Sequence, residues 1–187
     1  MRKLVAAINM TLDGFCDHTA IDADDEIHQH YNDLLRNSGT LIYGRITYQL
    51  MESYWPWVVK NPTGNKPMDD FAVLIDNIQK IVFSRTLKNV SWKNTELKKE
   101  VIKEEVVELK KSSQSDTNDI LVGSRSLIVT LLNLNLIDEF QLLVQPTILG
   151  NGLPLFKNIT DRISLKLIKT KNFSSGSIGL YYEPVKK

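Results

Sequence analysis

The chain has 187 residues, of which 42% are hydrophobic and 24% charged, and its formal net charge is +1. These values are typical of one globular domain and argue against a dedicated nucleic-acid-binding protein, which would carry a basic excess. The single cysteine, Cys16, excludes an internal disulfide and a multi-cysteine zinc site, and it fits a reducing compartment such as the cytoplasm. No apolar run approaches the roughly 20 residues that a bilayer requires, and we expect no membrane span and no signal peptide.

Strand and helix patterns alternate through the first two thirds of the chain. Short apolar runs are typical of strands buried on both faces, and segments with one apolar face are typical of helices. In chain order, we expect a strand over Lys3–Asn9, a helix over Asp22–Asn37, a strand over Thr40–Tyr43 and a helix over Thr47–Ser53. A loop over Trp55–Pro67 is followed by a helix over Met68–Ile78, a strand over Lys80–Phe83 and a short strand over Val90–Trp92. An amphipathic helix over Leu97–Lys111 and a polar linker over Ser112–Asn118 then lead to a strand, turn and helix over Asp119–Asn133.

Only strands follow. They are predicted over Phe140–Thr147, Leu165–Phe173 and Ser177–Glu183, and the last two form a hairpin through Ser174-Ser175-Gly176. The pattern predicts one α/β domain over residues 1–187, with a mostly parallel sheet that gains antiparallel strands at its C-terminal end. Ligands of such sheets bind beyond the carboxyl ends of the strands.

Three predicted strands end in turns that suit a phosphate. Gly44-Arg45-Ile46-Thr47 and Gly123-Ser124-Arg125-Ser126 each precede a helix, whose first backbone N–H groups attract anions. Glycine permits close approach, arginine pairs with phosphate, and Ser124 is placed to cap its helix. Ser84-Arg85-Thr86 contains no acid and is suited to the 2′-phosphate of NADP. Each turn alone also fits an ordinary solvated turn, but together they favour a nucleotide.

Other residues with reactive side chains have simpler explanations. Asp13 follows the first strand and is placed to bind a substrate hydroxyl or move a proton, although Asp-Gly is also a common turn. His28 and His30 are two residues apart on a helix and diverge, so no metal site is expected. Cys16 has no evident base, and Trp55 with Trp57 forms either a hydrophobic lid or part of the core.

The ordered set of motifs resembles the C-terminal reductase domain of the bifunctional deaminase/reductase of riboflavin biosynthesis and its stand-alone bacterial relatives, in the dihydrofolate-reductase-like superfamily. The resemblance covers the chain from Lys3 to about Pro184. The motifs that carry it are Thr11-Leu12-Asp13-Gly14, Tyr43-Gly44-Arg45-Ile46-Thr47-Tyr48, the run from Lys80 to Leu87, the run from Asp119 to Leu127, Leu136-Ile137-Asp138-Glu139-Phe140, Pro146 to Gly152 with Leu155-Phe156, and Phe173 to Tyr182.

The resemblance implies a central eight-stranded mixed sheet between helices, NADPH bound across the strand ends, and hydride transfer to a pyrimidine-like or pterin-like substrate. It also implies a homodimer and no metal. By the same resemblance, the cofactor phosphates contact Gly44, Arg45 and Thr47, the pyrophosphate is held by Gly123, Ser124 and Arg125, and the 2′-phosphate by Ser84 and Arg85. The resemblance also implies that Asp13 is catalytic and borders the nicotinamide or substrate. The residues that it implies on the substrate side are Gly150, Asn151, Gly152, Asp25 and Glu26.

The chain also departs from the family pattern. It lacks the deaminase zinc motifs and the Met-Pro-Trp loop of true dihydrofolate reductases, and it shows no evident basic set for the ribose phosphate of the riboflavin intermediate. Three alternatives therefore stay open: dihydrofolate reduction, reduction of another small heterocycle or carbonyl, and a non-catalytic nucleotide-binding module.

Overall fold

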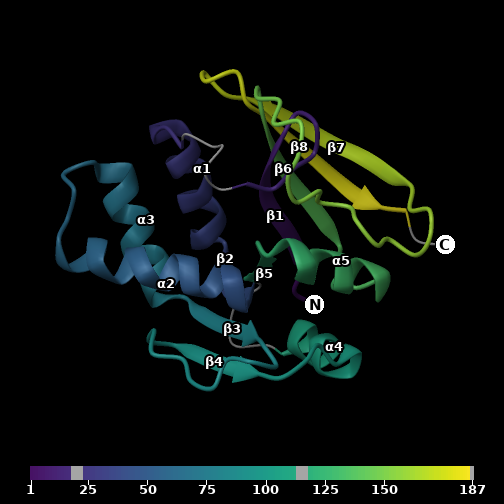
Figure 1. The fold of residues 1–187 in the computed structure, drawn as a ribbon, viewed down its shortest axis with the longest axis horizontal. Helices are drawn as coiled ribbons and strands as arrows, with labels where there is room; N and C mark the ends of the chain where they lie inside the picture. Colours follow the sequence, from purple (N-terminus) through teal and green to yellow (C-terminus); the bar gives the residue numbers. More distant parts are fainter. Residues whose placement is uncertain (18–22, 113–117, 186–187) are drawn as a thin grey trace.

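The computed structural model describes residues 1–17, 23–112 and 118–185. The described strands form one eight-stranded sheet in the order β4-β3-β2-β5-β1-β6-β8-β7 (Figure 1). Their bounds are β1 Leu4–Thr11, β2 Ser38–Gly44, β3 Gln79–Phe83, β4 Thr95–Lys98, β5 Asp119–Val122, β6 Glu139–Gln145, β7 Leu165–Asn172 and β8 Ile178–Pro184.

Helices cover both faces of this sheet and give three layers. Their bounds are α1 Asp25–Arg36, α2 Arg45–Lys60, α3 Lys66–Asn77, α4 Lys103–Lys111 and α5 Arg125–Asn133. Alternation along β1 separates two cores, since successive strand residues point to opposite faces. Leu4 and Ala6 pack with residues of α4 and α5, whereas Val5 and Ala7 pack with residues of α1, α2 and α3. Within the described ranges, no helix is long and apolar enough to cross a membrane.

Strand directions confirm the predicted mixed, mostly parallel sheet. From β4 through to β6, neighbouring strands pair in parallel. The reversal comes from β8, which pairs antiparallel with both β6 and β7. Because β8 is reversed between them, β7 runs in the same direction as β6. The hairpin through residues 174–176 is confirmed, but it adds one reversed strand rather than two.

The predicted loop over Trp55–Pro67 is wrong in its first half. Helix α2 continues to Lys60 with Pro56 inside it. Proline removes one backbone donor and normally breaks a helix, but here the side chains on either side are held by packing. Val58 is buried, and Trp55 packs on Phe71 with ring centroids 4.5 Å apart. Tertiary burial therefore outweighs the local helix-breaking signal.

The prediction for residues 90–111 also needs correction. The helix begins at Lys103, and the preceding Thr95–Lys98 forms β4, which extends the sheet beside β3. Val90–Trp92 is not a strand. Trp92 is instead buried, and its indole N–H donates to the Asp76 carboxylate at 2.7 Å. The polar alternation of β4 matches a solvated edge strand as well as a helix face, so periodicity alone could not separate them.

The first helix begins later than predicted. Asp24 is its N-cap residue, with a side-chain oxygen that accepts from Ile27 N at 2.8 Å. The earlier part of that prediction, at Asp22, lies outside the described residues, as does most of the predicted linker over 112–118. The next helix after α2 begins at Lys66, just before Pro67, a favourable position for proline because its missing N–H is not needed there.

Candidate functional site

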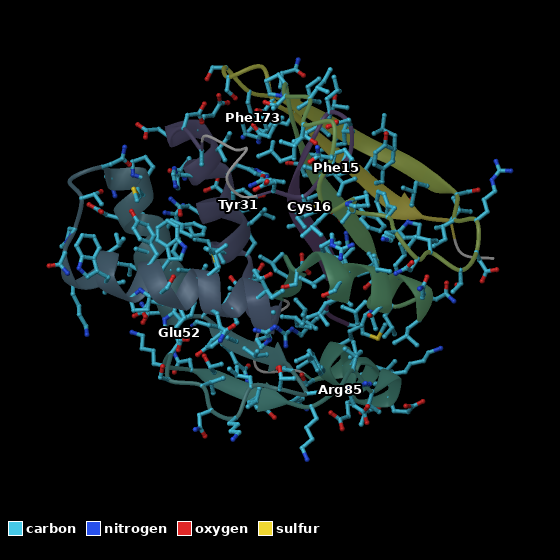
Figure 2. The ribbon with its side chains drawn as sticks, in the orientation of Figure 1. Phe15, Cys16, Tyr31, Glu52, Arg85 and Phe173 are labelled. Carbon is cyan, nitrogen blue, oxygen red and sulfur yellow. The ribbon has the colours of Figure 1, made fainter. Side chains whose placement is uncertain are left out.

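A cavity of about 650 Å³ lies beyond the carboxyl ends of the central strands. Gly44 at the end of β2, Phe83 at the end of β3 and Gly123 after β5 line it, together with residues of α1, α2, α3 and α5. Figure 2 shows Tyr31 of α1 and Cys16 of the segment after β1 on opposite sides of this central region. The site is therefore at the edge of the sheet where α/β proteins bind ligands.

Two helix N-termini meet at one end of the cavity. Gly44 is the N-cap of α2 and Ser124 the N-cap of α5, and neither helix has a side-chain capping bond. The prediction that Ser124 caps its helix is wrong, because its hydroxyl instead accepts from Gly44 N at 2.9 Å. This bond joins the ends of β2 and β5. It leaves the first backbone N–H groups of both helices available to an anion.

Two arginines stand at these N-termini, and both line the cavity together with Thr47. Arg45 Nη1 donates to Gln49 Oε1 at 3.1 Å, and Arg125 Nη1 donates to the carbonyl oxygen of Pro154 at 3.0 Å. Of the predicted cofactor residues, the structure therefore brings together the sets that begin at Gly44 and Gly123. Positive charge and helix dipoles coincide there, as an anionic ligand requires.

The predicted 2′-phosphate residues lie apart from this cavity. Ser84 is buried, and its hydroxyl accepts from the backbone N–H groups of Thr86 and Leu87 at 3.2 and 2.9 Å. The Arg85 side chain is 81% exposed and lies 3.5 Å from Glu100. Figure 2 places Arg85 at the lower edge of the molecule. Neighbouring Phe83 lines the cavity, so Arg85 is two residues beyond a wall of the site.

Asp13 does not line the cavity but fixes a neighbouring loop. Its carboxylate accepts from Thr11 Oγ1 at 2.6 Å, from Leu149 N at 3.1 Å and from Gly150 N at 2.7 Å. The Thr11 hydrogen bond, with the backbone bonds from the loop, lowers the pKa of Asp13 below its ordinary value. Predicted Gly150, Asn151 and Gly152 are exposed in this loop and also lie outside the cavity lining.

The two acids predicted on the substrate side have structural partners. Asp25 accepts from Asn65 Nδ2 at 2.6 Å, which links α1 to the start of α3. Glu26 accepts from Ser174 N and Ser174 Oγ, both at 2.8 Å, and these bonds lower the pKa of Glu26. Neither acid lines the cavity. Both hold neighbouring elements against α1.

The other end of the cavity contains residues that were not predicted for the site, apart from Trp55, for which a hydrophobic lid and a core position were both left open. Apolar and aromatic side chains of α1, α2 and α3 form it, with Asn9 of β1. Trp55 belongs to this wall, and so does His28, whose ring contacts Trp55 and Phe71 edge to face at centroid distances of 6.5 and 6.1 Å. The available signal was the face of α1 that carries Ile27, His28, Tyr31 and Leu35 at helical spacing. That spacing is equally typical of a core.

The remaining reactive groups are arranged without a metal set or an activated nucleophile. Burial raises the pKa of the Cys16 thiol to about 11, with nearby Arg125 opposing the shift. His28 lines the cavity, whereas His30 contacts Phe173 and Tyr181 on the hairpin side of α1. In the described ranges, no group of three His, Cys, Asp or Glu side chains is placed to hold a metal ion.

The eight-stranded sheet, parallel from β4 to β6 with the antiparallel β8 beside β6 and helices on both faces, has the architecture of a dihydrofolate-reductase-like fold. The family model described as the RibD C-terminal domain matches residues 2–178, and the chain belongs to this family. The chain is 34% identical to the uncharacterised Bacillus subtilis protein YyaP over 184 residues, which is 97% of this chain and 94% of YyaP.

Solved structures share the fold. A Shewanella sp. PV-4 protein provisionally assigned to riboflavin biosynthesis has a TM-score of 0.74 and 19% identity, covering 98% of this chain and 99% of that one. A Thermotoga maritima diaminohydroxyphosphoribosylaminopyrimidine deaminase/5-amino-6-(5-phosphoribosylamino)uracil reductase has a TM-score of 0.64 and 17% identity. It covers 98% of this chain, which spans 57% of that longer protein. These comparisons confirm the family resemblance and the fold.

Proposed function

We propose that the protein is an NADPH-dependent reductase that transfers a hydride to a small pyrimidine-like or pterin-like molecule. The paired helix N-termini at Gly44 and Ser124, with Arg45 and Arg125, carry this proposal. Uncapped N–H groups and two guanidinium groups match the two charges of a dinucleotide pyrophosphate. A homodimer in the cytoplasm completes the proposal, by resemblance to the family and because the chain has one cysteine.

The residues present fit such a cofactor in several respects. Gly44 and Gly123 line the cavity at the two strand ends, and neither carries a Cβ that would separate a ligand from the backbone there. Bound there, the nicotinamide would supply the hydride that adds to the carbon of a C=N or C=O bond. The chain's own part is to hold the phosphates at α2 and α5, orient the rings and exclude water from the apolar end.

Three observations favour an enzyme over a non-catalytic nucleotide-binding module. Trp55 lines the cavity without filling it, and about 650 Å³ remains open. Phe15 is held away in a β-bridge with Pro154 and does not line the cavity. Asn9 and His28 also present polar groups to that space. For Asp13 we propose a supporting role in turnover, through the loop that it fixes. Asp25 and Glu26 support the site by holding α1.

The NADPH preference is tested by titrating the protein and its Arg85→Ala variant with NADPH and NADH, following nicotinamide fluorescence. We expect the wild type to prefer NADPH. Arg85→Ala should weaken NADPH by about 1.5–3 kcal/mol, roughly tenfold to a hundredfold, because a charged hydrogen bond to the 2′-phosphate is lost. NADH affinity should not change.

Arg162→Ala is the matched control, since Arg162 is another exposed arginine and does not line the cavity. It should leave both affinities unchanged. Equal weakening of NADPH and NADH by Arg85→Ala would remove the 2′-phosphate assignment. Absence of binding by either dinucleotide to the wild type would overturn the reductase proposal and would mean that the fold is kept without its cofactor.

A further inference from the structure

The cavity has two ends of different character: an arginine end at Arg45 and Arg125, and an aromatic end at Tyr31, Trp55 and Phe71. The lysine and arginine side chains of its described lining are confined to the arginine end. The arginines that line it, Arg45 and Arg125, are the first residues of α2 and α5, and no lysine lines it in the described part of the chain. The sequence of residues 18–22 contains neither lysine nor arginine. If a dinucleotide pyrophosphate occupies both arginines, as the proposed function requires, no lysine or arginine of the described lining remains at the other end to pair with a phosphate on the substrate.

The other end has walls that suit a flat ring. Trp55 and Phe71 meet at a centroid distance of 4.5 Å and an angle of 61°, and Tyr31 lies 6.5 Å from Phe71. These side chains come from α1, α2 and α3, so packing between helices fixes their positions. Aromatic walls of this kind favour burial of a planar, uncharged ring.

One hydrogen-bond acceptor is available among these walls. His28 Nδ1 lies 3.0 Å from the backbone carbonyl oxygen of Asp24. A carbonyl only accepts, so Nδ1 carries the hydrogen, and in the neutral ring Nε2 carries the lone pair. Within the described residues, Nε2 has no hydrogen-bond partner. His28 therefore offers an acceptor to a molecule in the cavity that it lines.

A donor lies on the facing strand. The Tyr31 hydroxyl donates to Asn9 Oδ1 at 2.7 Å, and burial raises the pKa of this phenol, which keeps it protonated. Since Oδ1 is engaged, the Asn9 Nδ2 group is left with its hydrogens to donate. Tyr31 thus acts as a positioning residue that sets the orientation of the Asn9 amide.

We infer that the substrate is a neutral, planar heterocycle without a phosphate group, bound against the aromatic wall that Trp55 and Phe71 form, with its polar edge hydrogen-bonded to His28 and Asn9. This inference deepens the proposed function and rests on it for the occupant of the arginine end. It separates this chain from a reductase of phosphoribosylated pyrimidines. A dianionic phosphate buried at the aromatic end would find no lysine or arginine of the described lining to pair with its charge.

The first test compares ligands by calorimetry, with and without saturating NADP⁺. The probes are free pterin and an aminouracil riboside, each neutral, and the same riboside carrying a 5′-phosphate. We expect pterin and the neutral riboside to bind in the presence of NADP⁺. The riboside 5′-phosphate should bind at least tenfold more weakly than the neutral riboside. Equal or tighter binding of the phosphate form, or no binding of either neutral probe, overturns the inference. Failure of NADP⁺ to bind instead contradicts the proposed function, and with it the premise that the arginine end is occupied; the NADP⁺ titration alone therefore distinguishes the two failures.

The second test changes the acceptor while keeping the ring. His28→Phe retains the aromatic contacts and removes both nitrogens, and it should weaken pterin roughly fivefold to tenfold with NADP⁺ affinity unchanged. His30→Phe is the matched control, two residues along α1 and outside the cavity lining, and should change neither. His28→Gln supplies an acceptor again and should recover most of the affinity. Pterin affinity that is the same in His28→Phe as in wild type overturns the role of His28.

Discussion

The two ends of the cavity are built from different parts of the chain. At the arginine end, the groups that we propose to bind a pyrophosphate are the first backbone N–H groups of α2 and α5, with Arg45 and Arg125. The ends of β2 and β5 place them, and the bond between Ser124 and Gly44 joins those ends. At the aromatic end, they are side chains from three helices, and Phe71 and Tyr31 also pack in the core. Backbone N–H groups at the arginine end depend little on individual core side chains. At the aromatic end the side chains also pack in the core, so replacing one of them lowers the free energy of unfolding as well as changing the site.

The largest effect on stability is expected at Phe71, on the aromatic end. Phe71 is buried and contacts Trp55, His28 and Tyr31. We expect Phe71→Ala to lower the free energy of unfolding by about 3–5 kcal/mol, because it removes a core ring and leaves a cavity. Urea unfolding measures the loss. Trp57→Ala is the control, since that ring is 56% exposed and its removal should cost within about 0.5 kcal/mol. Similar losses in both variants would show that the aromatic end is not part of the core.

The same contrast explains what the sequence predicted. The turns at Gly44 and Gly123 are predicted to bind phosphate because a short strand, a small residue and the start of a helix follow one another along the chain. The topology then requires parallel neighbours such as β2 and β5 to present those turns at one edge. The parallel direction of the main strands was predictable for the same reason, since apolar runs and the helices that connect them are local features. The order of the strands across the sheet was not predicted, because it depends on pairing between distant segments.

The aromatic end was not predictable in this way. His28, Trp55 and Phe71 come from three helices, and nothing in the local pattern of any one helix distinguishes a residue facing a cavity from one facing the core. The continuation of α2 through Pro56 was not predictable for the same reason. Packing of Trp55 and Val58 against other elements outweighs the proline, which locally predicts the end of a helix. Asp13 is a different case. Its Asp-Gly turn was visible, but its bonds to Leu149 and Gly150 join segments 136 or more residues apart.

A smaller effect is expected from the bond that joins the two strand ends at the arginine end. Ser124→Ala removes the acceptor for Gly44 N and should lower the free energy of unfolding by about 1 kcal/mol, the usual net value of one hydrogen bond. Ser126→Ala is the matched control, because Ser126 also lines the cavity and is exposed. It should leave stability unchanged in urea unfolding. Equal stability of Ser124→Ala and wild type would show that water replaces this acceptor without cost.

The smallest effect is expected where Asp13 holds the loop at residues 149–152. The pKa of Asp13 is lowered from 3.8, first by the Thr11 hydrogen bond and then by the loop N–H groups. A lowered folded pKa means that the bonds stabilise the loop above the ordinary value and are lost as the pH falls through the folded value. Amide hydrogen exchange at Leu149 and Gly150, corrected for its intrinsic pH dependence, should therefore lose protection below pH 3.8 while the sheet stays protected.

Asp13→Asn sharpens this expectation, because a neutral amide accepts these bonds more weakly than a carboxylate at every pH. The variant should show reduced protection of both loop amides already at neutral pH, lower turnover, and nearly unchanged NADPH affinity, since the loop lies outside the cavity lining. Loss of cofactor affinity would place Asp13 at the arginine end after all. Protection that is equal in variant and wild type would mean that the loop is held by its own backbone, with the carboxylate as a bystander.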